Sequence, residues 1–149
     1  KLKNFRPNNM TENKLQLSIV TPERLVVNEK VDQVNVPGVE GDLGILCNHA
    51  PILTTIRPGQ FSYESAGEKG RETIKMVVSG GYLEVTDNRV IVLAEAVEFL
   101  DEIDQERAQV SLARAEEMLS RTDLSDDEFE EAQNKLFRAI ARLEPTEEK

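Results

Sequence analysis

Residues 36–59 read VPGVEGDLGILCNHAPILTTIRPG, a stretch in which short apolar runs alternate with turn-forming residues. The apolar runs 44–47 and 52–56 are too short for helices, and a segment with Pro, Gly or Asn follows each of them. This pattern is typical of short strands joined by tight turns. The stretch also holds the single cysteine, Cys47, and the single histidine, His49, so it raises the question of an active site.

The same strand-like pattern continues on both sides of this stretch. AGEKG and TDN, both rich in turn residues, each separate two apolar runs, so we expect a hairpin at each. Eight or more strands within about 85 residues favour an antiparallel β-sandwich or barrel. Further runs of this kind occupy residues 15–20, 25–27, 31–36, 61–65, 73–78, 82–85 and 90–97.

A helical pattern replaces the strand pattern after Leu100. Ala108, Leu112, Ala115 and Leu119 are spaced to lie on one face of a helix that begins near Asp104. Small residues among them would let a second helix pack closely.

A second helix is predicted to begin at Ser125, because Glu128 three residues later completes a capping-box pattern. The short segment RTDLS at 121–125 makes the two helices an antiparallel hairpin, and Pro145 is expected to end the second helix. The apolar stripe expected on it consists of Phe129, Ala132, Leu136, Ile140 and Leu143.

These patterns divide the chain into three parts. Residues 1–9 are polar and unpatterned and precede Met10, so they are interpreted as an extension or a cloning remnant. Residues 10–100 form the predicted antiparallel β-sandwich or barrel, and residues 101–149 form the helical hairpin. Of the net charge of −10, the hairpin carries −8, with 15 acidic against seven basic residues.

The composition argues against several function classes. An acidic surface repels nucleic acid and anionic lipid, so we expect protein partners. There is no apolar run of 18 residues and no signal-peptide core, so direct membrane insertion is not expected. One cysteine and one histidine supply too few ligands for a zinc site, and no metal is expected.

Catalysis by Cys47 and His49 is also disfavoured. Two residues apart on a strand, they would lie on the same face, but no orienting acid or second histidine accompanies them. A packing role for Cys47 is the simpler interpretation. We therefore expect no catalytic residues in this stretch.

Residues 36–59, with SGGYLEV and VIVLAEAVE further on, resemble the epsilon subunit of the F-type ATP synthase. The resemblance covers residues 15–143 and includes the order of a ten-stranded sandwich and a two-helix hairpin. It implies a sandwich held by the gamma subunit and resting on the c-ring, with Asp42 and His49 on the turns that face the ring. The alternative for Asp42 is an ordinary turn cap beside glycine.

The hairpin carries a second resemblance. IDQERA at 103–108 fits the I/L-D-x-x-R-A pattern associated with ATP binding in bacterial epsilon subunits. Arg107, Arg114 and Arg121 recur every seven residues, so we expect a basic stripe along the first helix. The alternative is that Asp104 is only a helix cap and that the arginines pair with nearby glutamates. Carried over by position, the ATP contacts are Glu98, Asp104, Arg107, Arg114, Arg138 and Arg142.

The resemblance implies a non-catalytic rotor subunit, with no cofactor but with ATP as a regulatory ligand. Its hairpin would restrain ATP hydrolysis through the beta subunit of the catalytic head. Its place would be peripheral, at the cytoplasmic face of the bacterial inner membrane. The alternatives are a free-standing nucleotide-binding sensor that uses the hairpin arginines and, less simply, a thiol hydrolase.

Overall fold

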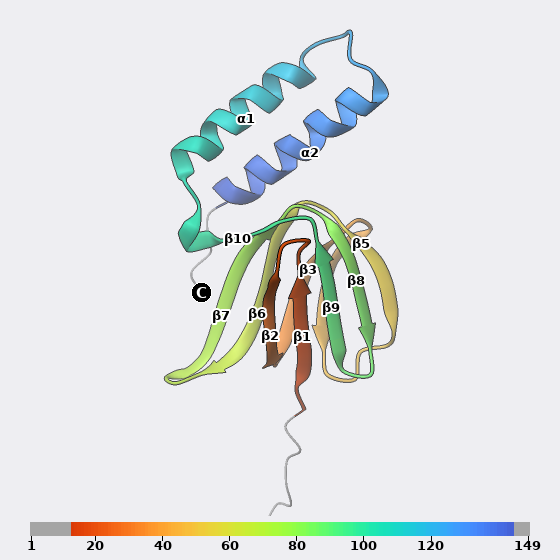
Figure 1. Cartoon of the computed structure of the whole chain (residues 1–149), viewed down its shortest axis with the longest axis vertical. Coiled ribbons are helices and arrows are strands. Elements are labelled where there is room, and N and C mark those ends of the chain that lie inside the picture. The colour runs from red at the N-terminus through yellow and green to blue at the C-terminus, as the bar shows by residue number, and fades with distance from the viewer. Residues whose placement is uncertain (1–12, 145–149) are drawn as a thin grey trace, which may run out of the picture.

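The computed structural model describes residues 13–144, which form ten strands, one short 3₁₀ turn and two α-helices (Figure 1). The expected sandwich followed by a hairpin is confirmed. Residues 1–9 and Pro145, for which expectations were stated above, lie outside the described residues. The strands are β1 (Leu15–Val20), β2 (Leu25–Val31), β3 (Gln33–Gly38), β4 (Gly41–Leu46), β5 (Ile52–Ile56), β6 (Gly59–Gly67), β7 (Gly70–Val78), β8 (Gly81–Thr86), β9 (Arg89–Ala94) and β10 (Val97–Phe99).

The strands share one hydrogen-bonded sheet that folds over into two layers. Its order is β10-β7-β6-β3-β5-β8-β9-β1-β2, and β4 lies off this path beside β3. The fold-over lies between β3 and β5, which are joined through the pair Gly38 and Ile56. The expected antiparallel pairing holds except between β1 and β9, which run parallel. Parallel pairing is possible there because the two strands are far apart in the chain and need no tight turn to join them.

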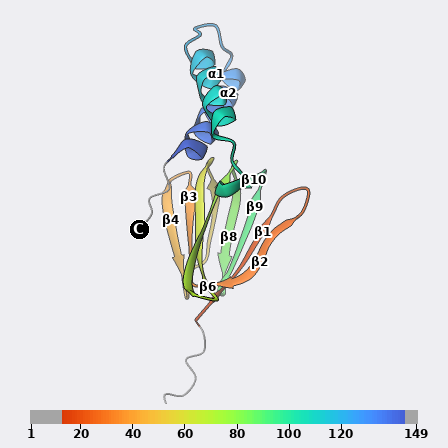
Figure 2. The ribbon, with the colours of Figure 1, turned by 90° about the vertical axis from the view of Figure 1, so that its left-hand side faces the viewer.

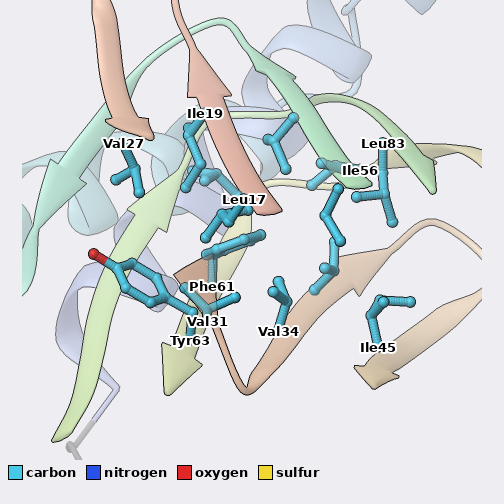
Figure 3. Close-up of a cluster of buried hydrophobic side chains, with 14 of the residues drawn as sticks. Leu17, Ile19, Val27, Val31, Val34, Ile45, Ile56, Phe61, Tyr63 and Leu83 are labelled. Carbon is cyan, nitrogen blue, oxygen red and sulfur yellow. The ribbon is translucent and has the colours of Figure 1, made fainter. Parts of the chain in front are cut away.

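The core lies between the two layers. Alternate residues of the strands point inward, as the burial of Leu15, Leu17 and Ile19 along β1 illustrates. Phe61 on β6 is fully buried among aliphatic side chains from the opposite layer (Figure 3). This burial of apolar side chains stabilises the sandwich.

The apolar run 90–97, taken above as one strand, is divided in the structure. β9 ends at Ala94, and β10 begins at Val97 and pairs with β7 instead of continuing beside β8. The chain thereby crosses from one layer to the other and brings Glu98 to the end of the sandwich from which the helices start (Figure 1).

The hairpin consists of α1 (Gln105–Leu119) and α2 (Asp126–Leu143), and the 3₁₀ turn Leu100–Glu102 precedes it. Both predicted starts are confirmed. Asp104 caps α1, and Ser125 and Glu128 form a reciprocal capping box at α2. The hairpin stands on one end of the sandwich (Figure 2).

Two expectations about the hairpin are wrong. The stripe of α2 was expected to include Phe129 and Ile140, but both are exposed, and Ala139 and Ala141 are buried instead. Small alanines allow close approach of the packed surfaces, which leaves the larger side chains outside. Arg121 is not on helix α1, because the helix ends at Leu119.

Candidate functional site

The start of α1 forms one wall of a hollow where the hairpin meets the sandwich. Asp104 accepts a hydrogen bond from the backbone N–H of Arg107 at 3.0 Å, which satisfies one of the free N–H groups of the first turn. The hollow has a volume of about 230 Å³. Its lining residues are Glu98, Glu102, Ile103, Asp104, Arg107, Ala108, Ser111 and Arg142.

Four of the six predicted ATP contacts therefore lie together: Glu98, Asp104, Arg107 and Arg142. They come from β10, the cap of α1, its first turn and the last turn of α2. Residues 44 positions apart in the chain meet here, because the hairpin folds back onto the strand that leads into it.

Arg142 is the most firmly held of these side chains. Its Nε donates to Oε2 of Glu98 at 2.6 Å, and 23% of its side chain is exposed. Its backbone carbonyl also accepts a hydrogen bond from Nε2 of Gln105 at 3.3 Å. Arg142 thus links α2 both to β10 and to the first residue of α1.

The other two predicted contacts lie elsewhere. Arg138 lines a second hollow, of about 380 Å³, between α2 and the end of the sandwich, and its Nε donates to the carbonyl of Asn134 at 3.3 Å. Arg114 is exposed and does not line the first hollow. The six predicted ATP contacts therefore do not all meet in this conformation, and ATP binding stays a prediction.

Charge in the first hollow is mixed. Three carboxylates (Glu98, Glu102, Asp104) and two guanidinium groups (Arg107, Arg142) line it. A phosphate group would be attracted by the arginines and repelled by the carboxylates, so it would have to lie on the arginine side. Glu102 and Ser111 were missed in the sequence; Ser111 could have been found, because it follows Arg107 by one helical turn.

The alternative interpretation of Arg121 as an ordinary surface ion pair is supported. Its Nε and Nη2 atoms donate to the two carboxylate oxygens of Asp123 at 3.1 and 3.0 Å, within the turn that joins the helices. These bonds lower the pKa of the Asp123 carboxyl. Because both side chains are exposed, the pair contributes little to stability.

Asp42 lies at one end of β4, and His49 lies three residues beyond Leu46, the residue at its other end. Asp42 is on the strand itself rather than on a turn, which corrects the expectation. Its Oδ1 accepts a hydrogen bond from Nη2 of Arg57 at 2.5 Å. Because β4 lies off the path of the sheet, it forms an edge that can meet a partner along its length.

His49 follows a turn in which Asn48 has a φ of 63°. Its backbone N–H donates to the carbonyl of Leu46 at 3.1 Å, and its Nδ1 donates to the carbonyl of Ala50 at 2.7 Å. Cys47 and His49 were expected to lie on one face of a strand. This expectation is wrong, because β4 ends at Leu46, before both residues. Cys47 is half-buried with its Sγ 3.9 Å from the carbonyl of Lys14.

In the stretch 13–144, no group of three or more His, Cys, Asp or Glu side chains is placed to hold a metal ion. Neither helix in the described part of the chain is long and apolar enough to cross a membrane.

Family models match both parts of the chain. The model of the ATP synthase delta/epsilon chain β-sandwich domain matches residues 14–100, and that of the long α-helix domain of the same chain matches residues 101–145. The chain belongs to the ATP synthase delta/epsilon family. The boundary between the two matches coincides with the change from strands to helices.

Relatives that are named ATP synthase epsilon chain match this chain over most of their length. The ATP synthase epsilon chain of Carboxydothermus hydrogenoformans is 52% identical over 72% of this chain and 78% of its own. The ATP synthase epsilon chain 2 of Syntrophotalea carbinolica is 41% identical over 88% of this chain and 92% of its own.

The fold also recurs in solved ATP synthases. A chain in the cryo-EM structure of the Euglena gracilis mitochondrial ATP synthase, OSCP/F1/c-ring, superposes with a TM-score of 0.76. It is 22% identical and covers 95% of this chain and 86% of its own. A chain from the central stalk/c-ring of the Tetrahymena thermophila mitochondrial enzyme gives 0.56 at 14% identity and covers 87% and 93%.

Proposed function

We propose that this chain is a non-catalytic rotor subunit in the central stalk of an F-type ATP synthase, where its sandwich is held by the gamma subunit and rests on the c-ring. The names of its relatives as ATP synthase epsilon chains support this assignment. So do the titles of its structural neighbours, which describe F1/c-ring and central stalk/c-ring assemblies. Its place is then peripheral, at the cytoplasmic face of the bacterial inner membrane.

The hairpin regulates ATP hydrolysis and senses ATP. The observation that carries this part is the hollow at the junction of β10, α1 and α2, where Arg107 and Arg142 lie together with Asp104 and Glu98. Guanidinium groups bind phosphate through charge-assisted hydrogen bonds, and a ligand that touches both helices binds only while they are folded together. At a concentration ten times its Kd, ATP would stabilise this folded state by about 1.4 kcal/mol.

When ATP is scarce, the helices separate and extend toward the catalytic head, where basic side chains meet an acidic segment of the beta subunit. Arg107 and Arg114 on α1 are available for such a contact. The charge of −8 on residues 101–149 opposes it, so we expect weak inhibition.

The test is the ATPase activity of the purified complex with and without residues 101–149. Removal of the hairpin should raise hydrolysis modestly, and more at low salt, where exposed charges are less screened. A tenfold or greater activation would contradict weak inhibition, and no change would contradict the regulatory role. A chain that does not co-purify with gamma in the membrane-bound ATPase would instead fit a free-standing nucleotide sensor.

A further inference from the structure

Three strands at the end of the sandwich place one residue each in a single row. Gln60 on β6 pairs in register with Val77 on β7, and Val77 pairs with Glu98 on β10. Residues paired in this way have side chains on the same face of the sheet. The neighbours of Val77 along β7, Met76 and Val78, are in the sandwich core, so the row points to the outer face.

Val77 is nevertheless buried. It is 1% exposed although it does not belong to the core cluster between the layers. An apolar side chain on the outer face can be buried in this way only if another element covers it. Helix α2 packs against both β6 and β7, and its last turn ends beside them, while the 3₁₀ turn Leu100–Glu102 also contacts β7 (Figure 1).

On one side of Val77, Gln60 caps the end of α2. Its Nε2 donates to the carbonyl of Ala141 at 3.1 Å and lies 3.4 Å from that of Glu144. The last four carbonyls of an α-helix have no partner within the helix. The sandwich thus supplies hydrogen bonds that α2 cannot make for itself, at a place where Ala141 is only 3% exposed.

On the other side of Val77, Glu98 pairs with the side chain of Arg142 at 2.6 Å. The row therefore offers a hydrogen-bond donor, an apolar contact and an acid, and the last turn of α2 presents a carbonyl, a buried alanine and a base. We propose that Gln60, Val77 and Glu98 form a seat that holds the last turn of α2 and so sets how often the hairpin leaves the sandwich.

The effect of the seat on ATP hydrolysis rests on the function proposed above, but the existence of the seat does not. The seat and the regulatory role of the hairpin can therefore be tested separately. Amide hydrogen exchange of the isolated full chain measures how often α2 opens, since exchange in a closed element follows the population of its open form. The variants are Gln60→Met, which keeps the length of the side chain but removes the donor, and Val77→Ala.

The expected result is that exchange of amides between residues 130 and 143 becomes about three- to tenfold faster in Gln60→Met, the range expected for one lost hydrogen bond. Amides of β1 and β9 should keep their rates. Gln16→Met is the matched control, because Gln16 Nε2 donates to Asn28 Oδ1 at 2.8 Å on the other layer. It should leave the exchange of α2 unchanged.

Unchanged exchange of α2 in both Gln60→Met and Val77→Ala would overturn the seat. If Val77→Ala does not fold, Gln60→Met alone decides, because its side chain lies outside the core. The ATPase activity of the complex assembled with Gln60→Met gives the second result. Faster exchange with an unaltered ATPase would keep the seat and reject the regulatory function of the hairpin.

Discussion

Glu98 and Arg142 form a hydrogen-bonded ion pair with an Nε–Oε2 distance of 2.6 Å, which joins strand β10 to the last turn of α2. The sequence predicts both residues as ATP contacts, yet in this conformation the guanidinium of Arg142 already donates a hydrogen bond to the carboxylate of Glu98. A phosphate group that binds Arg142 must therefore compete with a carboxylate that is already in place.

The first prediction concerns which arginines bind ATP. If the hollow seen here is the site, calorimetry on the isolated chain should show one ATP site that Arg107→Ala or Arg142→Ala weakens at least tenfold. Arg138→Ala should weaken it much less, because Arg138 lines the other hollow. Arg121→Ala is the control, since that side chain pairs with Asp123 in the turn.

A tenfold loss in Arg138→Ala would instead show that the hairpin rearranges around ATP to bring Arg138 in. If calorimetry shows no heat of binding at millimolar ATP, the chain has no ATP site, and the arginines serve only in ion pairs.

A second prediction concerns the edge strand β4. If this edge rests along the c-ring, Asp42→Cys and His49→Cys should both cross-link to the ring in complexes assembled from a Cys47→Ser parent. Glu23→Cys, on the turn between β1 and β2, should not. Cross-linking at only one of these two positions would show that the sandwich meets the ring by one end.

A third prediction compares two phenylalanines. Phe61→Ala should lower the free energy of unfolding of the sandwich by about 3–5 kcal/mol, because it removes a fully buried ring and leaves a cavity. Phe129→Ala should change stability little, because its side chain is 49% exposed. Urea unfolding followed by circular dichroism measures both, and similar losses in the two variants would contradict the burial described above.

A fourth prediction uses the capping box of α2. Hydrogen bonds from the backbone and side chain of Ser125 lower the pKa of Glu128 below its ordinary value of 4.5. A carboxyl with a lowered pKa in the folded state contributes stability above its unfolded pKa and loses it as the pH falls through the folded one.

The helical signal should accordingly decrease as the pH falls below 4.5, and this decrease should be smaller in Glu128→Gln. Ser125→Ala should destabilise the helix by about 1 kcal/mol at neutral pH. Circular dichroism against pH checks both variants, with Ser120→Ala, at the other end of the turn, as the control.

A fifth prediction concerns the division into domains. The core cluster consists of residues from the strands. Residues 10–100 alone should therefore stay folded, give a β-type circular dichroism spectrum and bind gamma. An unfolded fragment would show that the hairpin is needed for the sandwich, for instance through its cover over Val77.

Local patterns in the sequence determined the secondary structure and the order of the parts. Alternation of apolar residues located β1, and the Ser125–Glu128 spacing located the start of α2, because both signals depend on residues only a few positions apart. The resemblance carried by residues 36–59 and 103–108 indicated the family. The run 90–97 was misread, since whether a strand continues or crosses to another layer depends on its distant partner β7.

Tertiary structure alone decided which of the predicted site residues meet. Arg138 and Arg142 are one turn apart on α2 and looked equivalent, but only Arg142 reaches Glu98, because the last turn of α2 lies on the sandwich. Asp42 and His49 proved to lie near opposite ends of an edge strand, and Gln60 drew no attention in the sequence. The positions of these residues depend on contacts between segments far apart in the chain. The packing of the whole fold sets these contacts, and no short sequence pattern encodes them.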